Sequence, residues 1–141
     1  MPVATGYLLA VACGPLGAWT ATHTGLALPG SACGANALLT LLVAAPVLEE
    51  TIFRGGLQSW LAPRLSARIG CLSLANLVVA CVFGTVHALH QGSPVALLTG
   101  IPALMMGWVW ELSGARLLAP VLLHAWYNLC IVLLSCDWST P

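Results

Sequence analysis

Five long apolar runs occupy most of this 141-residue chain and restrict what it can fold into. Only 6% of its residues are charged, so the chain cannot cover itself with a surface suited to water. About 20 apolar residues cross a bilayer, and lipid offers the backbone no hydrogen bonds, so each run is predicted to be a spanning helix. Short breaks rich in Gly, Pro, Ser or Arg bound the runs, which cover residues 4–20, 34–60, 71–90, 94–112 and 117–136.

The predicted fold is all-α: a polytopic transmembrane helix bundle of about five spanning helices. The breaks are short, so consecutive helices are expected to be antiparallel neighbours, and residues 1–141 are expected to form a single membrane domain. The first run lacks the basic region of a signal peptide and is followed by further spans. It is therefore interpreted as a retained helix.

The arginines predict how the chain is oriented in the membrane. The chain has no lysine, and three of its four arginines, Arg64, Arg68 and Arg116, lie in the breaks after the second and fourth runs. Alternating crossings put these two breaks on one side, and basic residues near the ends of spans are retained in the cytoplasm. The N-terminus is therefore predicted to be cytoplasmic, with the tail that carries Asp137 outside.

Charge and cysteine usage limit the kinds of partner. The net charge is zero and no basic run occurs, which argues against nucleic acid or an anionic lipid surface as an electrostatic partner. The cysteines show neither a CxxC pair nor a zinc-type spacing, and they are interpreted as small apolar side chains packed between helices. They are Cys13, Cys33, Cys71, Cys81, Cys130 and Cys136.

Three ionisable side chains, Glu49, Glu50 and Arg54, interrupt the second apolar run. Each charge costs a few kcal/mol at the centre of a membrane unless something compensates it. Glu50 and Arg54 are four residues apart and share a helix face, whereas Glu49 is turned away by about 100°. Arg54 is therefore expected to neutralise Glu50, leaving Glu49 in a polar cavity as a general base that acts on water. A buried ion network without chemistry and a proton relay are the alternatives.

Two further helices carry polar side chains that suit the same chemistry. His87 lies near the end of the third run, and His124 and Asn128 lie one turn apart on one face of the fifth. Taken alone, a histidine on a membrane helix is more often a hydrogen-bonded interior residue than a catalyst. Together with Glu49 they favour hydrolysis of an acyl bond, in which Glu49 and His87 activate water while His124 and Asn128 stabilise the oxyanion.

Zinc is an alternative to the metal-free mechanism. Glu49, His87 and His124 also constitute a catalytic zinc ligand set with an open fourth position. The HExxH signature is absent, so these ligands would have to converge from three helices. The metal-free glutamate mechanism, with no cofactor, is the preferred prediction.

Three motifs now form a recognisable series on successive helices: Glu49-Glu50-x-x-x-Arg54, Phe83-x-x-x-His87 and His124-x-x-x-Asn128. They resemble the motifs of the CPBP family, the CAAX proteases and bacteriocin-processing enzymes also called Abi or type II CAAX prenyl endopeptidases. The resemblance covers about residues 44–129. It implies a helical intramembrane protease that cuts a peptide bond of a membrane-associated protein or peptide near the membrane face.

The resemblance also assigns roles to residues. Glu49 and the histidine of the second motif, His87, would activate water, and His124 and Asn128 would stabilise the oxyanion. Members of the family have been described both as metalloproteases and as glutamic proteases, so zinc stays open here too. Supporting positions would be Glu50, Arg54 and Phe83.

The substrate and the setting follow less directly from the resemblance. Eukaryotic members trim prenylated CAAX proteins, whereas this compact chain looks like a prokaryotic member in a plasma membrane, processing a C-terminal sorting tail or a leader peptide. Usual members have more spans, so helices that shape the substrate entrance are either missing or supplied by an oligomer or partner subunit. The second hypothesis for the function is a non-catalytic immunity or membrane-interaction protein of the same fold, and the third is a small transporter or proton relay.

Overall fold

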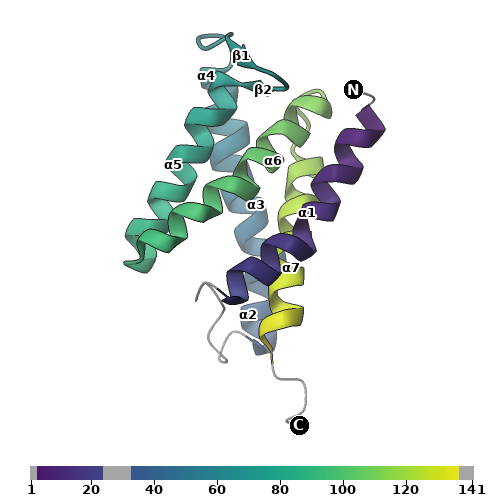
Figure 1. Ribbon diagram of the computed structural model, residues 1–141, viewed down its shortest axis with the longest axis vertical. Coiled ribbons are helices and arrows are strands. Elements are labelled where there is room, and N and C mark those ends of the chain that lie inside the picture. Colours follow the sequence, from purple (N-terminus) through teal and green to yellow (C-terminus); the bar gives the residue numbers. More distant parts are fainter. Residues whose placement is uncertain (1–2, 24–32, 137–141) are drawn as a thin grey trace.

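The structure, a computed structural model, describes residues 3–23 and 33–136 (Figure 1). Five helices in this part of the chain are long and apolar enough to cross a membrane, which confirms the predicted all-α polytopic bundle. Each end lies within three residues of its predicted position. The helices are α1 (Val3–His23), the composite helix Ala35–Leu61, α5 (Leu74–Gln91), the composite helix Pro94–Leu112 and α7 (Leu118–Ser135).

The second span is a composite of α-helical and π-helical turns, here called the α2–α4 helix. Pro46 has no N–H to offer the carbonyl of Leu42, so the turn before it loses a hydrogen bond and winds more loosely. π-Helical turns are rare and often lie at functional sites, and a second such segment begins directly after Glu50. The segments are α2 (Ala35–Leu39), η2 (Thr40–Ala44), α3 (Ala45–Glu50), η3 (Thr51–Gln58) and α4 (Ser59–Leu61).

A short β-hairpin, which the sequence did not predict, joins the α2–α4 helix to α5. Its strands are β1 (Arg68–Ile69) and β2 (Leu72–Ser73), paired antiparallel. The hairpin delivers Ser73 to the N-terminus of α5, where its side chain accepts a hydrogen bond from the backbone N–H of Asn76. The other end of α5 is closed by Gly92, which has a positive φ of 62°.

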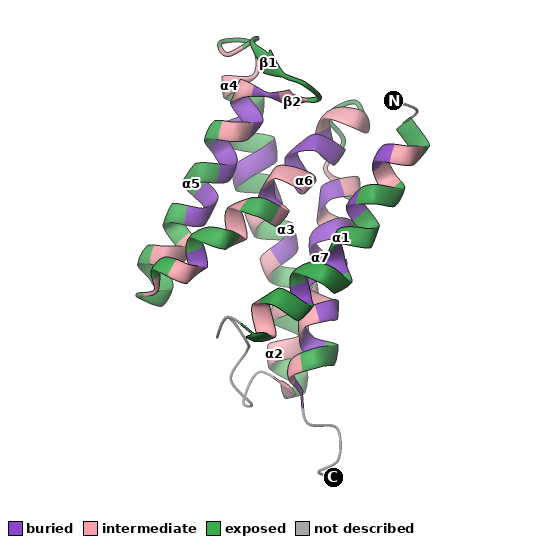
Figure 2. Cartoon of the chain, in the orientation of Figure 1, coloured by how far each residue is buried: buried purple, intermediate pink, exposed green. Residues whose placement is uncertain are grey.

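The fourth span opens with a 3-10 turn, η4 (Pro94–Thr99), and continues as α6 (Gly100–Leu112). It packs closely on α5, because a Cβ on Gly84 would lie only 2.6 Å from the carbonyl oxygen of Leu97. In Figure 2 the buried residues line the inner faces of the helices and the exposed ones point outward. The outward apolar faces suit contact with lipid.

The lengths and tilts of the helices set the depth of His87. α6 crosses obliquely in front of the α2–α4 helix, and the connection between α5 and η4 lies at mid-height, short of the lower ends of α2 and α7 (Figure 1). His87 stands one turn before that connection. It lies level with Glu49, in the middle of the α2–α4 helix, because Nε2 of His87 is 3.9 Å from Oε2 of Glu49.

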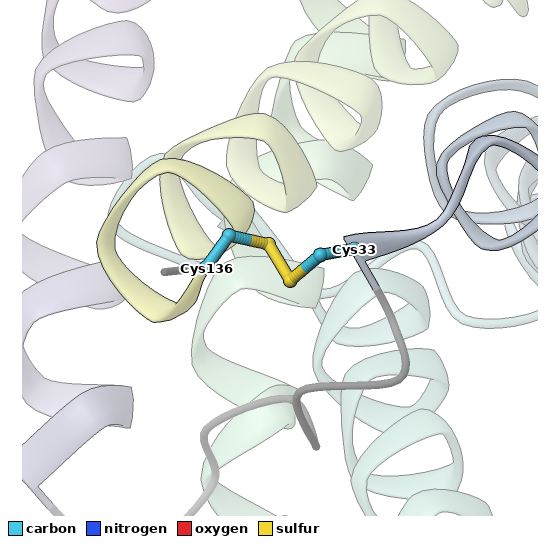
Figure 3. Close-up of a disulfide and its surroundings, with 2 residues drawn as sticks. All are labelled: Cys33 and Cys136. Atoms are coloured by element: carbon cyan, nitrogen blue, oxygen red, sulfur yellow. A yellow bond between two sulfur atoms is a disulfide. The ribbon is translucent and has the colours of Figure 1, made fainter. Parts of the chain in front are cut away.

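One disulfide corrects the interpretation of the cysteines. Cys33 and Cys136, 103 residues apart, are bonded, with their Cα atoms 5.8 Å apart (Figure 3). The bond joins the start of the second span to the end of α7. Both cysteines border apolar runs, so the sequence pattern did not distinguish them from packing residues. In the described part of the chain the remaining four are free thiols: Cys13, Cys71, Cys81 and Cys130.

Candidate active site

Three helices bring one carboxylate and two imidazoles together. Oε2 of Glu49, at the end of α3, lies 3.9 Å from Nε2 of His87 on α5 and 3.8 Å from Nε2 of His124 on α7. The side chains of Glu49 and His87 are 29% and 23% exposed, so the cluster is partly open, whereas that of His124 is 8% exposed. The structure thus places these three sequence-predicted residues around one point.

The Nδ1 atoms of both histidines face acceptors, which orients the rings. Nδ1 of His87 lies 3.0 Å from the carbonyl oxygen of Phe83, one turn earlier on α5. A carbonyl oxygen can only accept, so this nitrogen carries a proton. The Phe83 ring also stacks on His87, with ring centroids 4.2 Å apart. Backbone and aromatic contacts therefore direct Nε2 of His87 toward Glu49.

Glu50 orients the ring of His124 in the same way, by a hydrogen bond to Nδ1. Its Oε1 accepts a hydrogen bond from Nδ1 of His124 at 3.0 Å, and its Oε2 accepts one from Nε of Arg54 at 2.9 Å. The side chains of Glu50 and Arg54 are both fully buried. The expected Glu50–Arg54 ion pair is present, and in low dielectric such a pair is worthwhile only when its remaining hydrogen bonds are made. Nη2 of Arg54 makes one, to the carbonyl oxygen of Ala103 at 3.0 Å.

The Glu50–His124 contact was missed at the level of sequence. The two residues are 74 positions apart, and a helical spacing reveals only contacts three or four positions apart. One signal for this contact was available in the sequence. A single arginine beside two glutamates left one oxygen of the Glu50 carboxylate without an assigned partner.

Asn128 has a partner outside the carboxylate–imidazole cluster. Its Nδ2 donates a hydrogen bond of 2.8 Å to the carbonyl oxygen of Leu41, in η2. This bond ties α7 to the loosely wound turn of the second span. Asn128 still lies one turn from His124, on the same helix.

The donor types match zinc, but their spacing does not. Zinc bonds of about 2.1 Å would put tetrahedral ligand atoms about 3.4 Å apart. The separations from Glu49 to the two imidazole nitrogens, 3.9 and 3.8 Å, are wider. Among the residues that the structure describes, no three His, Cys, Asp or Glu side chains are placed to hold a metal ion together. The Nδ1 hydrogen bonds of both histidines are nevertheless typical of zinc-bound imidazoles.

Comparison with known proteins identifies the family. The model of the type II CAAX prenyl endopeptidase Rce1-like family matches residues 31–130, a range that contains all three motifs. The curated proteins and the solved structures gave no match. The matched range is well over half of the chain, and the five apolar helices agree with an integral membrane protein. The chain therefore belongs to the Rce1-like family of type II CAAX prenyl endopeptidases, which are intramembrane CAAX-type proteases.

Proposed function

We propose that this chain is an endopeptidase that hydrolyses a peptide bond of a membrane-anchored protein or peptide with water activated by Glu49 and His87. One observation carries the proposal: Oε2 of Glu49 faces the Nε2 atoms of two histidines from two other helices of the bundle. The family match supports the reaction class.

The proposed reaction begins with a water held between Glu49 and His87. Glu49 takes a proton from the water while the water oxygen adds to the peptide carbonyl carbon. The carbonyl π bond becomes an oxyanion, which needs hydrogen-bond donors. When the tetrahedral intermediate collapses and the C–N bond breaks, the proton on Glu49 passes to the leaving nitrogen. The carboxylate is then ready for another cycle.

His124 and Asn128 are the proposed donors to the oxyanion. This role requires His124 to carry protons on both ring nitrogens, with Nδ1 donating to Glu50 and Nε2 to the oxyanion. The amide nitrogen of Asn128 has two hydrogens. One is directed at the carbonyl oxygen of Leu41, and the second is the one assigned to the oxyanion.

The proposed mechanism uses no metal. The wide Glu49–histidine separations leave room for a water between the side chains, and they exceed the spacing of zinc ligands. If zinc were bound, Glu49, His87 and His124 would hold it and it would polarise water or the peptide carbonyl.

The proposed setting is a prokaryotic plasma membrane with the N-terminus in the cytoplasm. Arg64, Arg68 and the hairpin lie at one end of the bundle, and the Cys33–Cys136 disulfide belongs to the other, where α2 begins and α7 ends (Figure 1). Basic residues favour the cytoplasmic side, and disulfides persist in oxidising compartments such as the periplasm. In this setting the proposed substrate is a C-terminal sorting tail or a leader peptide, rather than a prenylated protein.

The test compares cells that produce the wild-type protein with cells that produce Glu49→Gln, mapping new peptide termini in the membrane fraction by mass spectrometry. Loss of the base should lower cleavage by about 10²-fold or more. Asp137→Asn removes a carboxylate from the C-terminal tail and serves as the control. Purified wild-type protein in liposomes should then cut a synthetic single-span peptide that carries the mapped site. Identical termini in wild-type and Glu49→Gln cells would refute the proposal.

A further inference from the structure

A stripe of buried polar side chains runs from the Glu49–histidine cluster toward the end of the bundle that carries Arg68 and the hairpin. Arg54 and Gln58 follow Glu50 at intervals of four residues along the α2–α4 helix, and all three are completely buried. Nη2 of Arg54 donates to the carbonyl oxygen of Ala103, and Nε2 of Gln58 donates to that of Gly107 at 3.2 Å. The stripe therefore lies along α6.

The stripe ends at Glu111, where α5 and the hairpin join it. Oε1 of Glu111 accepts hydrogen bonds from Nε2 of Gln58 at 3.1 Å and from the hydroxyl of Ser73 at 2.5 Å. Asn76, also completely buried, donates from Nδ2 to the carbonyl oxygen of Leu104 at 2.9 Å. We call the side chains of Arg54, Gln58, Asn76 and Glu111 the polar column.

Several atoms of the polar column have no hydrogen-bond partner within the described part of the chain. They are one donor, Nη1 of Arg54, two amide acceptors, Oε1 of Gln58 and Oδ1 of Asn76, and Oε2 of Glu111, which forms an ion pair with Arg68 but no hydrogen bond. Oε2 of Glu49, at the reacting end, is buried and without a hydrogen bond as well. Such groups are rare inside proteins because leaving them without a partner is costly.

The two amide oxygens converge beside Gly107. A Cβ built on Gly107 would lie 1.9 Å from Oδ1 of Asn76 and 2.7 Å from Oε1 of Gln58, so both oxygens lie on the same side of this glycine. Two acceptors cannot satisfy each other. A water molecule has two hydrogens to give them, so one water fits the requirement of both oxygens, and a second water would supply the acceptor that Nη1 of Arg54 requires.

At Glu111 the polar column borders a cavity of about 330 Å³. Glu111 lines this cavity together with Arg68, and the two form an ion pair of 3.1 Å. The side chain of Arg68 is half exposed, so this end is in contact with the surroundings of the protein. Glu111 thus connects the cavity to Gln58, and through it to the buried polar atoms that lack hydrogen-bond partners.

We propose that the polar column binds a chain of water molecules and carries the hydrolytic water from the cavity beside Arg68 to Glu49. The inference rests on the proposed function, because hydrolysis consumes one water per bond cut and the hydrocarbon around the helices supplies none. Beyond Arg54, direct contacts through Glu50 and His124 connect the polar column to Glu49, and the water is proposed to pass beside these side chains.

The first experiment measures water in the polar column without measuring cleavage. Single cysteines replace Gln58 or Asn76 in a protein whose four free cysteines are replaced by serine or alanine and whose disulfide is kept. X-ray pulses create hydroxyl radicals from water in place, and mass spectrometry follows oxidation of each thiol. Val79→Cys, one turn from Asn76 and completely buried in the apolar core, is the dry reference, and the exposed Ser66→Cys is the wet one.

Gln58→Cys and Asn76→Cys should oxidise several-fold faster than Val79→Cys. Rates equal to that of Val79→Cys would overturn the inference. Because these replacements could impair folding, the unmodified protein provides a second measurement. In solid-state NMR of the protein in lipid, magnetisation from water should reach the side-chain amides of Gln58 and Asn76 well before the backbone amide of Val79. Equal build-up times would likewise overturn the inference.

The second experiment links the water to turnover. Gly107→Ala puts a methyl group where Oδ1 of Asn76 lies, so it should disrupt the water site and lower kcat several-fold while KM for a cleaved peptide stays close to that of the wild type. Gly6→Ala, on α1, is the control, because its Cβ would also be crowded, with an atom of Leu112 at 2.7 Å, but by side chains outside the polar column. Equal kcat values for the two variants would refute the supply role. A wet column in an inactive protein would refute only the proposed function, and a dry column in an active one only this inference.

Discussion

Oε1 of Glu50 lies 3.0 Å from Nδ1 of His124, while the other oxygen of the same carboxylate binds Arg54 at 2.9 Å. One buried side chain thus connects α3 to α7 and holds a cation from its own helix. Because Nδ1 of His124 is occupied, its Nε2 is the nitrogen that faces Glu49. The two neighbouring glutamates therefore have different surroundings, one holding the bundle together and one bordering a partly open cluster.

Glu50→Gln should destabilise the fold strongly, because it leaves the Arg54 charge buried without a counter-charge. Breaking a buried pair in this way typically costs about 3–5 kcal/mol of unfolding free energy. Thermal or denaturant unfolding in detergent micelles measures the effect. The double variant Glu50→Gln, Arg54→Met should recover part of the loss, and a double variant no more stable than Glu50→Gln would contradict the assignment of Glu50 as the partner of Arg54.

Asn128→Ala should lower both activity and stability, because the amide has two proposed tasks. Loss of an oxyanion donor lowers turnover by about 10²–10³-fold. Loss of the bond to the Leu41 carbonyl lowers the unfolding free energy by about 1–3 kcal/mol. Cleavage should be assayed well below the unfolding temperature of the variant. Full activity there would leave Asn128 with the structural task alone.

Strong chelators should leave cleavage unchanged. In the preferred mechanism Glu49 and His87 activate the water without a metal. Extended treatment with EDTA or 1,10-phenanthroline is therefore expected to have no effect, and elemental analysis of active protein should find no stoichiometric zinc. Inhibition that added zinc reverses would instead favour the alternative in which Glu49, His87 and His124 bind the metal.

Thiol labelling of intact cells tests the orientation. Cys71 is a free, exposed thiol in the hairpin at the arginine-bearing end, so a membrane-impermeant maleimide should label it only after the cells are lysed. Cys33 and Cys136 should become labelled in intact cells once an impermeant reductant has opened their disulfide. Labelling of Cys71 in intact cells would reverse the predicted orientation.

The sequence predicted those features that depend on local periodicity. Apolar runs gave the span ends, and the four-residue spacing of Glu50 and Arg54 gave their ion pair, because helix geometry alone places such residues side by side. The convergence of Glu49, His87 and His124 was expected on chemical grounds and is present in the structure. Their catalytic roles stay predictions.

Features that depend on the packing of distant segments were not predicted. Asn128 reaches Leu41 because α7 lies beside η2, and Gln58 and Asn76 meet beside Gly107 because α5 and the α2–α4 helix both contact α6. No spacing within a single helix encodes these meetings. The Cys33–Cys136 bond is the clearest case, since Cys33 lies at the start of the matched region and Cys136 lies just beyond its end.

That bond turns residues 33–136 into a covalently closed ring that contains every residue of the three motifs, with α1 attached outside it as a tether. A protease that nicks the ring once, for instance between α6 and α7, would open it without releasing a fragment. The site-bearing helices would still migrate as one species on a non-reducing gel. A nick between α1 and Cys33, in contrast, would detach the first helix from an otherwise intact ring.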